Sequence, residues 1–239
     1  MDACSMPVPG AAPRTGSFYM RSLPRDLDAL DSRAGRARFR EALLGGTMEG
    51  YFKLAQQLQT QAEPAYCGLG SLVCALNALR IDPARTWKGP WRWFSEELLT
   101  CCKSLQEITR SGLTLDEVAC LARCSGATVS VHRPPLEGID AFREHVRDAA
   151  TDSDGPVVIV NYSRSAVGQT GDGHFSPIGG YHAATDRVLV LDTARFKYPP
   201  HWLSLELLFD AMSEEDRDSQ CARGWLTLQR QTGLVPSQF

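Results

Sequence analysis

The chain has 239 residues, of which 43% are hydrophobic and 22% charged, and its formal net charge is −3. This length suits one large domain or two small ones, and the balance excludes wholesale disorder. A small negative net charge argues against nucleic acid as a partner, since phosphate binding needs clustered Lys and Arg. The longest purely aliphatic run, Val157–Val160, is too short for a helix that spans a membrane, so no membrane partner is expected.

Residues 1–17 are rich in Pro, Gly, Ala and Ser, which predicts a flexible N-terminal arm. No apolar stretch typical of a secretory signal follows Met1, so we expect a cytoplasmic protein. In that compartment the cysteines are expected to be reactive, metal-binding or buried thiols rather than a disulfide framework. One catalytic domain is expected over residues 18–230, followed by a short tail over 231–239.

Apolar periodicity predicts several helices in the first half of the chain. Helices are expected over 33–57 with a break at 45–46, over 95–103 and over 138–149. Thr114 and Glu117 form a capping box at the start of another helix, which Gly126 ends, and residues 88–91 read as a turn. A further stripe of helical spacing begins just after Cys67 and comprises Leu69, Leu72, Val73, Leu76 and Leu79.

The second half is richer in β-branched and apolar runs. Residues 157–160 predict a buried strand, and shorter strands are expected at 129–131 and 224–228. Strands over 174–182 and 188–192 flank a predicted turn, and a helix is expected over 203–212. A helical first half followed by an antiparallel β-rich second half indicates an α+β fold.

Cys67 is the most informative residue because it lies where a predicted helix begins. The partial positive charge of a helix N-terminus lowers the pKa of a thiol and favours the nucleophilic thiolate. The alternative is a small buried core residue, which is the commonest role of a free cysteine.

A cysteine nucleophile needs a base, and His174 and Asp192 are the best candidates for base and orienting acid. They lie at the open ends of the predicted hairpin, and their even separation is compatible with a directly opposed pair on one face. His182 falls at the turn end and is better explained as structural, His145 lies on a charged and solvated helix face, and His132 lies in a loop.

Gln61, six residues before Cys67, is placed to complete an oxyanion hole with a backbone N–H group. A solvated loop glutamine is the alternative. A Cys, His, Asp order with a Gln upstream is typical of papain-like thiol enzymes.

Five long motifs closely resemble the catalytic domain of the phytochelatin synthase family, over about residues 18–228. They are GTMEGYF at 46–52, QAEPAYCGLG at 61–70, WKGPWRWF at 87–94, GQTGDGHFSPIGGYH at 168–182 and LDTARFKYPPHW at 191–202. The resemblance implies a papain-like fold, with Cys67, His174 and Asp192 as catalytic triad and Gln61 as oxyanion donor. It also implies an acyltransferase, a glutathione γ-glutamylcysteinyltransferase, that transfers the γ-Glu-Cys unit of glutathione to another glutathione or a phytochelatin oligomer.

Arg195 and Lys197 suit the carboxylates of such an anionic substrate. The resemblance implies no organic cofactor, and activation by Cd, Zn or Cu ions carried as glutathione thiolates. Plant members of the family carry a further Cys-rich C-terminal domain, whereas bacterial members are as short as this sequence and lean towards hydrolysis. A glutathione hydrolase that releases γ-Glu-Cys and Gly therefore stays an alternative. A non-enzymatic thiol protein binding metal is a third, and the candidate ligands are Cys101, Cys102, Cys120 and Cys124. Buried thiols are the other reading of these four residues, and a homodimer is left open.

Overall fold

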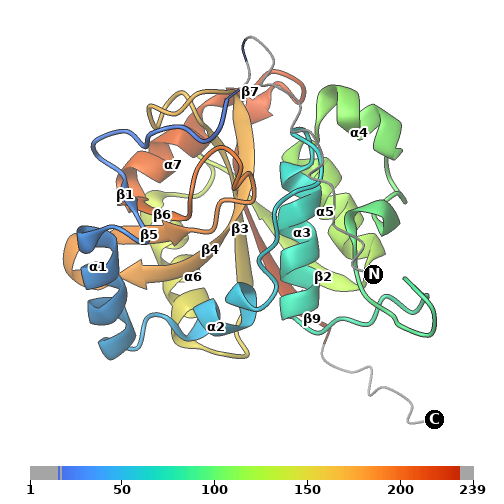
Figure 1. The fold of residues 1–239 in the computed structure, drawn as a ribbon, viewed down its shortest axis with the longest axis horizontal. Coiled ribbons are helices and arrows are strands. Elements are labelled where there is room, and N and C mark those ends of the chain that lie inside the picture. Colours follow the sequence, from blue (N-terminus) through green and yellow to red (C-terminus); the bar gives the residue numbers. More distant parts are fainter. Residues whose placement is uncertain (1–15, 17, 232–239) are drawn as a thin grey trace, which may run out of the picture.

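The structure, a computed structural model, describes residue 16 and residues 18–231 (Figure 1). Apart from residues 16 and 231, the arm expected over 1–17 and the tail expected over 231–239 lie outside the described residues. The helices are α1 (Arg33–Leu44), α2 (Glu49–Ala55), α3 (Cys67–Ala78), η1 (Glu96–Leu98), α4 (Leu105–Ser111), α5 (Leu115–Cys124), α6 (Ile139–Thr151), η2 (Ala183–Thr185) and α7 (Leu205–Ser213). The strands are β1 (Asp28–Ala29), β2 (Ala127–His132), β3 (Val157–Ser163), β4 (Gly173–His182), β5 (Arg187–Val190), β6 (His201–Ser204), β7 (Glu215–Asp216), β8 (Cys221–Ala222) and β9 (Gly224–Arg230).

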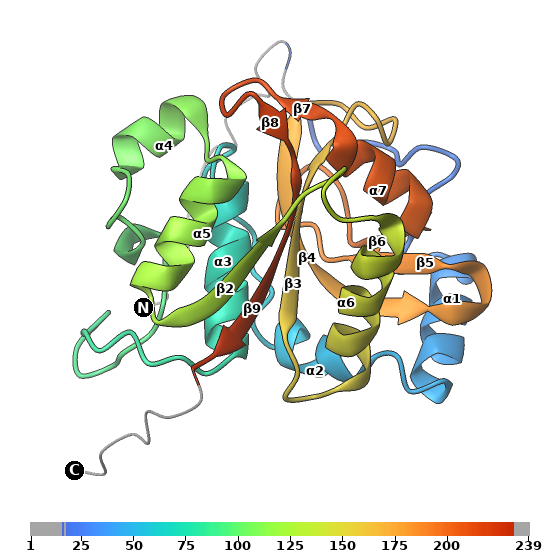
Figure 2. The same ribbon diagram turned by 180° about the vertical axis from the view of Figure 1, so that it is seen from behind.

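An antiparallel sheet of seven strands forms the centre of the described part, in the order β1-β6-β5-β4-β3-β9-β2. Helix α3 lies on one face, and α6 and α7 lie on the other, as the front and back views show (Figures 1 and 2). Helices α4 and α5 extend beside α3. The expected α+β fold is confirmed, with most helices before the sheet strands in sequence.

Strand β3 shows how the sheet divides the core. Its side chains alternate between faces, as in any strand. Val157 and Ile159 pack in the cluster with α3 and α5, whereas Val158, Val160 and Tyr162 pack in the cluster with α6 and α7. Both faces are covered, which is why the apolar run Val157–Val160 is buried, as predicted, and the remaining residues of the strand are buried too.

Helix α3 is almost entirely buried, and its predicted apolar stripe is confirmed. The helix packs closely at its first turn because Gly68 and Gly70 carry no side chain there. A Cβ on Gly68 would lie 3.0 Å from Val118, and one on Gly70 would lie 3.1 Å from Glu96 and 3.3 Å from Gln61. These glycines let the neighbouring segments approach the start of the helix.

One helix prediction is wrong, and another is confirmed except for its start. The helix expected over 95–103 is only the short η1, and α4 starts afterwards, where Ser104 and Glu107 form a capping box. The helix expected over 203–212 begins at Leu205, because the preceding residues form β6 against β5 and Ser204 caps the helix. Pairing with a neighbouring strand overrides local helical spacing.

The β4–β5 hairpin contains a one-residue bulge. His182 pairs with Arg187 near the turn, but Ile178 pairs with Val190, so Gly179 is an extra residue on β4. A one-residue shift exchanges the faces of all later side chains on that strand. The bulge therefore decides which β4 residues share a face with the segment that follows β5.

Among the described residues, no helix combines the length and apolarity needed to cross a bilayer.

Candidate active site

Cys67 is the first residue of α3 and is only partly buried. Burial raises the pKa of its thiol, although the backbone N–H of Phe175, the Arg164 guanidinium and the backbone N–H of Gly68 all favour the thiolate. The predicted lowering of this pKa is therefore wrong: the helix terminus acts in the expected direction, but desolvation outweighs it. The resting group is a thiol.

His174 and Asp192 meet as predicted. His174 lies on β4, Asp192 lies two residues after β5, and Nε2 of the imidazole is 2.9 Å from Oδ1 of the carboxylate. The two residues are not directly opposed, since His174 pairs with Tyr162 on the other neighbouring strand. The bulge at Gly179 brings the imidazole and the carboxylate to one face, where both are buried.

The two groups have opposite charge preferences in this buried setting. Burial and the nearby Arg164 guanidinium lower the pKa of His174 to about 4, although Asp192 pulls it upward. Burial disfavours a charged Asp192, but His174 and Arg164 hold the pKa of that carboxyl well below its usual range. At neutral pH the resting site therefore combines a thiol, a neutral imidazole and a carboxylate, and His174 is available as a general base.

A buried arginine behind the pair was missed by the sequence analysis. Nη2 of Arg164 donates to Asp192, at 3.0 Å from Oδ1 and 2.9 Å from Oδ2. Nη1 of Arg164 donates to Gln169, whose Nε2 donates to His201 at 3.2 Å, and Nδ1 of His201 donates to the Pro199 carbonyl at 2.9 Å. Each donor in this hydrogen-bond network has an acceptor, so the network fixes the position of the Asp192 carboxylate. Asp192 also accepts a bond from the backbone N–H of Ala194, at 2.9 Å.

Cys67 contacts the residue that follows His174 on β4. Its sulfur is stabilised by the backbone N–H of Phe175, the next residue on β4. Helix α3 and strand β4 thus bring the thiol and the imidazole to the same end of the sheet. Catalytic contacts in a free site commonly tighten only when substrate binds.

Cys67 lines a cavity of about 500 Å³, a size suited to a small ligand. One wall is the connection between α4 and α5, and another is the segment that carries β7 and β8. Three arginines line it: Arg110 and Arg217 are exposed, whereas Arg223 is buried and donates to Asp172 at 3.0 Å. The sequence analysis overlooked these arginines because they are far apart in the chain.

Gln61 lies beside the first turn of α3, but its amide does not face the cavity as an unpaired donor. Its Nε2 donates to the carbonyls of Glu63 and Pro64, both at 2.9 Å. Its Oε1 accepts a bond from the Thr193 hydroxyl at 3.1 Å, and its backbone N–H donates to the Thr193 carbonyl at 3.0 Å. Gln61 is thus buried and tied to the residue after Asp192, so the alternative of a solvated loop residue is wrong. Its oxyanion role stays a prediction.

The two cations predicted to bind substrate lie in different places. Arg195 lines a separate cavity with Phe39 and Tyr51, and the structure does not bring it to the cavity of Cys67. Lys197 lies against the loop that leads into β4, where a Cβ on Gly171 would be 2.9 Å from its Nζ.

The remaining histidines do not line the cavity of Cys67. His182 contacts Glu41 at 2.9 Å and Thr185 at 2.7 Å, as its place at the turn predicts. The expectations for the other two are wrong. His132 lies in β2, and His145 is partly buried and accepts a bond from the Trp225 indole at 3.1 Å.

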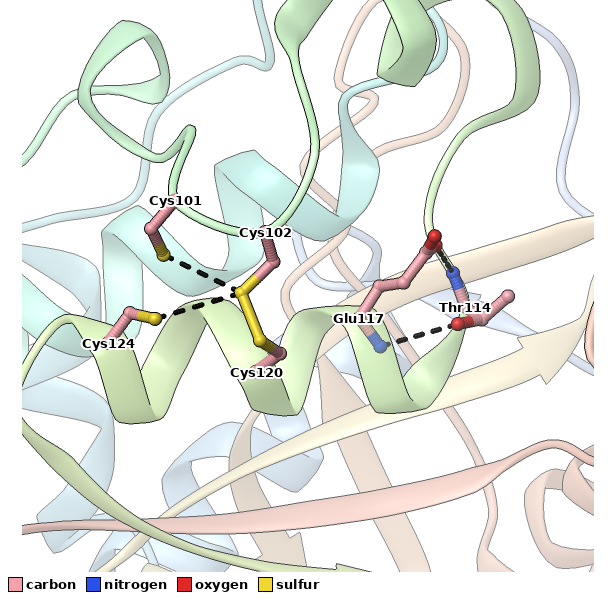
Figure 3. The surroundings of a disulfide bond; sticks show 6 residues. All are labelled: Cys101, Cys102, Thr114, Glu117, Cys120 and Cys124. Atoms are coloured by element: carbon pink, nitrogen blue, oxygen red, sulfur yellow. Dashed lines mark hydrogen bonds between the residues drawn. A yellow bond between two sulfur atoms is a disulfide. The ribbon is translucent and has the colours of Figure 1, made fainter.

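One pair of cysteines departs from the expectation of reduced thiols. Cys102 and Cys120 form a disulfide, with an S–S distance of 2.11 Å (Figure 3). Cys74 is a buried core thiol, whereas Cys101, Cys124 and Cys221 are free and exposed. Cys4 lies outside the described residues.

An antiparallel sheet whose His and Asp meet beside a cysteine at the start of a buried helix defines the class of papain-like proteins. A family model described as phytochelatin synthase matches residues 18–225. The chain belongs to the phytochelatin synthase family.

Several curated proteins are similar over most of this chain. Glutathione gamma-glutamylcysteinyltransferase 3 of Lotus japonicus is 50% identical over 218 residues, which cover 90% of this chain and 45% of the relative. Glutathione gamma-glutamylcysteinyltransferase 1 of Arabidopsis thaliana is 51% identical over 216 residues, 90% of this chain and 44% of the relative. The Schizosaccharomyces pombe protein of that name is 45% identical over 213 residues, 89% of this chain and 51% of the relative. The chain thus spans about half the length of these relatives.

Proposed function

We propose that the chain is a glutathione γ-glutamylcysteinyltransferase that makes phytochelatins. The observation that carries this proposal is the convergence of Cys67, His174 and Asp192 at one end of the sheet, with Cys67 lining a cavity large enough for a tripeptide. The names of relatives that are about half identical to this chain support the same activity and the same substrate.

In the proposed first step, His174 takes the proton of the Cys67 thiol as the sulfur attacks the carbonyl of the Cys–Gly peptide bond of glutathione. The carbon–nitrogen bond then breaks. Gly leaves with a proton from His174, and a γ-Glu-Cys thioester remains on Cys67. The amine of a second glutathione, or of an oligomer, attacks the thioester, which lengthens the product by one unit and restores the thiol.

The surroundings of the cysteine suit this chemistry. The backbone N–H of Cys67 at the helix start and the amide of Gln61 are the proposed oxyanion donors. Gln61 would have to give up at least one of its two bonds to the carbonyls of Glu63 and Pro64 to reach a tetrahedral intermediate. Arg110 and Arg217, two exposed residues that line the cavity, are the proposed contacts for substrate carboxylates. Lys197 is proposed as a further contact.

We also propose that heavy-metal ions activate the reaction as glutathione thiolates, because soft sulfur ligands suit Cd and Cu ions. The proposed partners are therefore glutathione and phytochelatin oligomers. A cytoplasmic location fits this thiol substrate, since glutathione keeps thiols reduced there. The oligomeric state, including a homodimer, can be measured on the same sample.

The test is incubation with glutathione, with and without Cd²⁺, followed by mass spectrometry of the products. Oligomers of γ-Glu-Cys ending in Gly are expected, whereas only γ-Glu-Cys and Gly would identify a hydrolase. Cys67→Ser should abolish the release of Gly, because a serine hydroxyl ionises far less readily than a thiol. Cys221→Ser is the control, since Cys221 is exposed and does not line the cavity. A Cys67→Ser protein that keeps more than about a tenth of the turnover contradicts covalent catalysis at this residue.

A further inference from the structure

Glu96, the first residue of η1, is a buried acid that the proposed mechanism does not use. Both oxygens of its carboxylate accept the backbone N–H of Ala62, at 3.1 Å from Oε2 and 3.3 Å from Oε1. Burial raises the pKa of this carboxyl, whereas the Ala62 N–H favours its charged form. Among the described residues no cationic side chain forms an ion pair with Glu96. Since buried acids are normally paired, a carboxylate held by one backbone amide calls for an explanation.

The segment that carries Glu96 is fixed to α3. The Asn77 side chain of α3 donates to the Phe94 carbonyl at 3.0 Å and accepts the Phe94 backbone N–H at 3.2 Å. Two residues further on, the carboxylate of Glu96 lies against the first turn of α3. A Cβ on Gly70 there would be 3.1 Å from Oε1 of Glu96 and 3.3 Å from the Cβ of Gln61. The helix therefore holds the carboxylate beside Gln61, and the partial positive charge of its first turn favours the ionised acid.

The amide that Glu96 accepts belongs to the residue after Gln61. On the other side, the backbone N–H of Gln61 donates to the carbonyl of Thr193, the residue that follows Asp192. The backbone at 61–62 is thus held from two sides. This matters because the proposed oxyanion role requires the Gln61 side chain to release a hydrogen bond within its own loop. The side chain can turn to a defined position only if its backbone stays in place.

We propose that Glu96 is a positioning residue for acyl transfer, which holds the Ala62 amide so that the Gln61 amide can turn towards the oxyanion of the tetrahedral intermediate. This inference rests on the proposed function. Glu96 does not line the cavity of Cys67, so it acts through Gln61 and not by contact with the substrate. The oxyanion forms only after the thiol has attacked. Loss of the contact should therefore lower kcat and leave KM unchanged.

The test measures kcat and KM from the initial rate of Gly release from glutathione by the full chain. Glu96→Ala should lower kcat by about tenfold or more, which is less than the loss of about 10²–10³-fold for a whole oxyanion donor. Glu96→Gln keeps an oxygen that can accept the Ala62 N–H, so it should lose less. The matched control is Glu97→Gln, because Glu97 is the exposed neighbour on η1 and accepts a bond from the Trp87 indole at 3.2 Å. This control should match the unsubstituted protein.

A double-variant cycle separates positioning from a merely structural role. Gln61→Ala removes the oxyanion donor, so adding Glu96→Ala should lower kcat no further if Glu96 acts through Gln61. An equal loss in both backgrounds overturns the inference, as does a Glu96→Ala protein whose kcat is unchanged or in which only KM changes. Glu96→Asp keeps the charge but is one methylene shorter, and it takes the place of Glu96→Ala should that variant not fold.

The same measurements distinguish this inference from the proposed function. An unsubstituted protein that releases no Gly from glutathione refutes the proposed function itself. An unsubstituted protein and a Glu97→Gln control that are active, together with equally active Glu96 variants, refute only the positioning role of Glu96.

Discussion

Arg164 and Asp192 form a buried ion pair in which one guanidinium nitrogen lies 3.0 and 2.9 Å from the two carboxylate oxygens. Both side chains are at most 3% exposed, so each charge depends on the other for compensation. The same carboxylate contacts the imidazole of His174. The orientation of the proposed catalytic base thus rests on an arginine that does not line the cavity of Cys67.

Loss of this pair should destabilise the fold strongly. Arg164→Gln leaves a buried carboxylate without its cation, and such a change costs about 3–5 kcal/mol. The control is Arg92→Gln, which breaks an exposed pair with Asp82 and should cost less than about 1 kcal/mol. Urea unfolding followed by circular dichroism gives both free energies. Equal losses in the two variants would show that the buried pair contributes nothing special.

The stability of the protein should fall as the solution becomes acidic. Burial and Arg164 lower the pKa of His174 from its usual value near 6.5 to about 4. Between these values the unfolded state binds more protons than the folded state, so the free energy of unfolding decreases as the pH drops. His174→Gln removes this titration and should flatten the slope between pH 6.5 and 4. Unfolding curves at several pH values test this, and parallel slopes for the two proteins would contradict it.

The Cys67 thiol should react slowly with alkylating reagents at neutral pH. Burial raises its pKa above the usual value near 9.0, and the neutral imidazole of His174 gives it no cationic partner. We expect the rate of alkylation by iodoacetamide at Cys67 to keep rising beyond pH 9.0, as measured by mass spectrometry of its peptide. Glutathione alkylated in the same solutions serves as the reference thiol. A rate that is already constant near pH 6 would instead indicate a preformed thiolate–imidazolium pair.

Gly180, the residue after the β4–β5 bulge, should not tolerate a side chain. A Cβ on Gly180 would meet the Sδ of the fully buried Met48 and lie 2.8 Å from its Cε. Gly180→Ala should therefore cost about 1–3 kcal/mol through overpacking. Gly138→Ala is the control, because nothing lies within 4 Å of a Cβ there. Thermal unfolding of both variants checks the difference, and a Gly180→Ala protein as stable as its control would contradict the packing argument.

The features that the sequence predicts correctly have local causes. The spacing of leucines in α3, the apolar run of β3 and the capping box at Thr114 each depend on a few neighbouring residues. The meeting of His174 and Asp192 was also predicted, because a hairpin joins them.

The features that were missed depend on partners far away in the chain. Arg164 is buried because Asp192 lies opposite it, and charge alone predicts an exposed side chain. The residues from His201 form a strand only because β5 lies alongside. The raised pKa of Cys67 has the same origin, since desolvation is set by the whole surrounding fold and not by the helix end alone.

The extra residue at Gly179 also constrains how the chain length can vary between His174 and Asp192. A single insertion or deletion along either strand would cancel or repeat the register shift and turn the imidazole and the carboxylate to opposite sides of the sheet. The two side chains keep the same face only if the hairpin is lengthened by two residues, one added to each strand at the tip. Whether the number of residues between His174 and Asp192 is odd or even therefore matters as much as the distance that the chain must span.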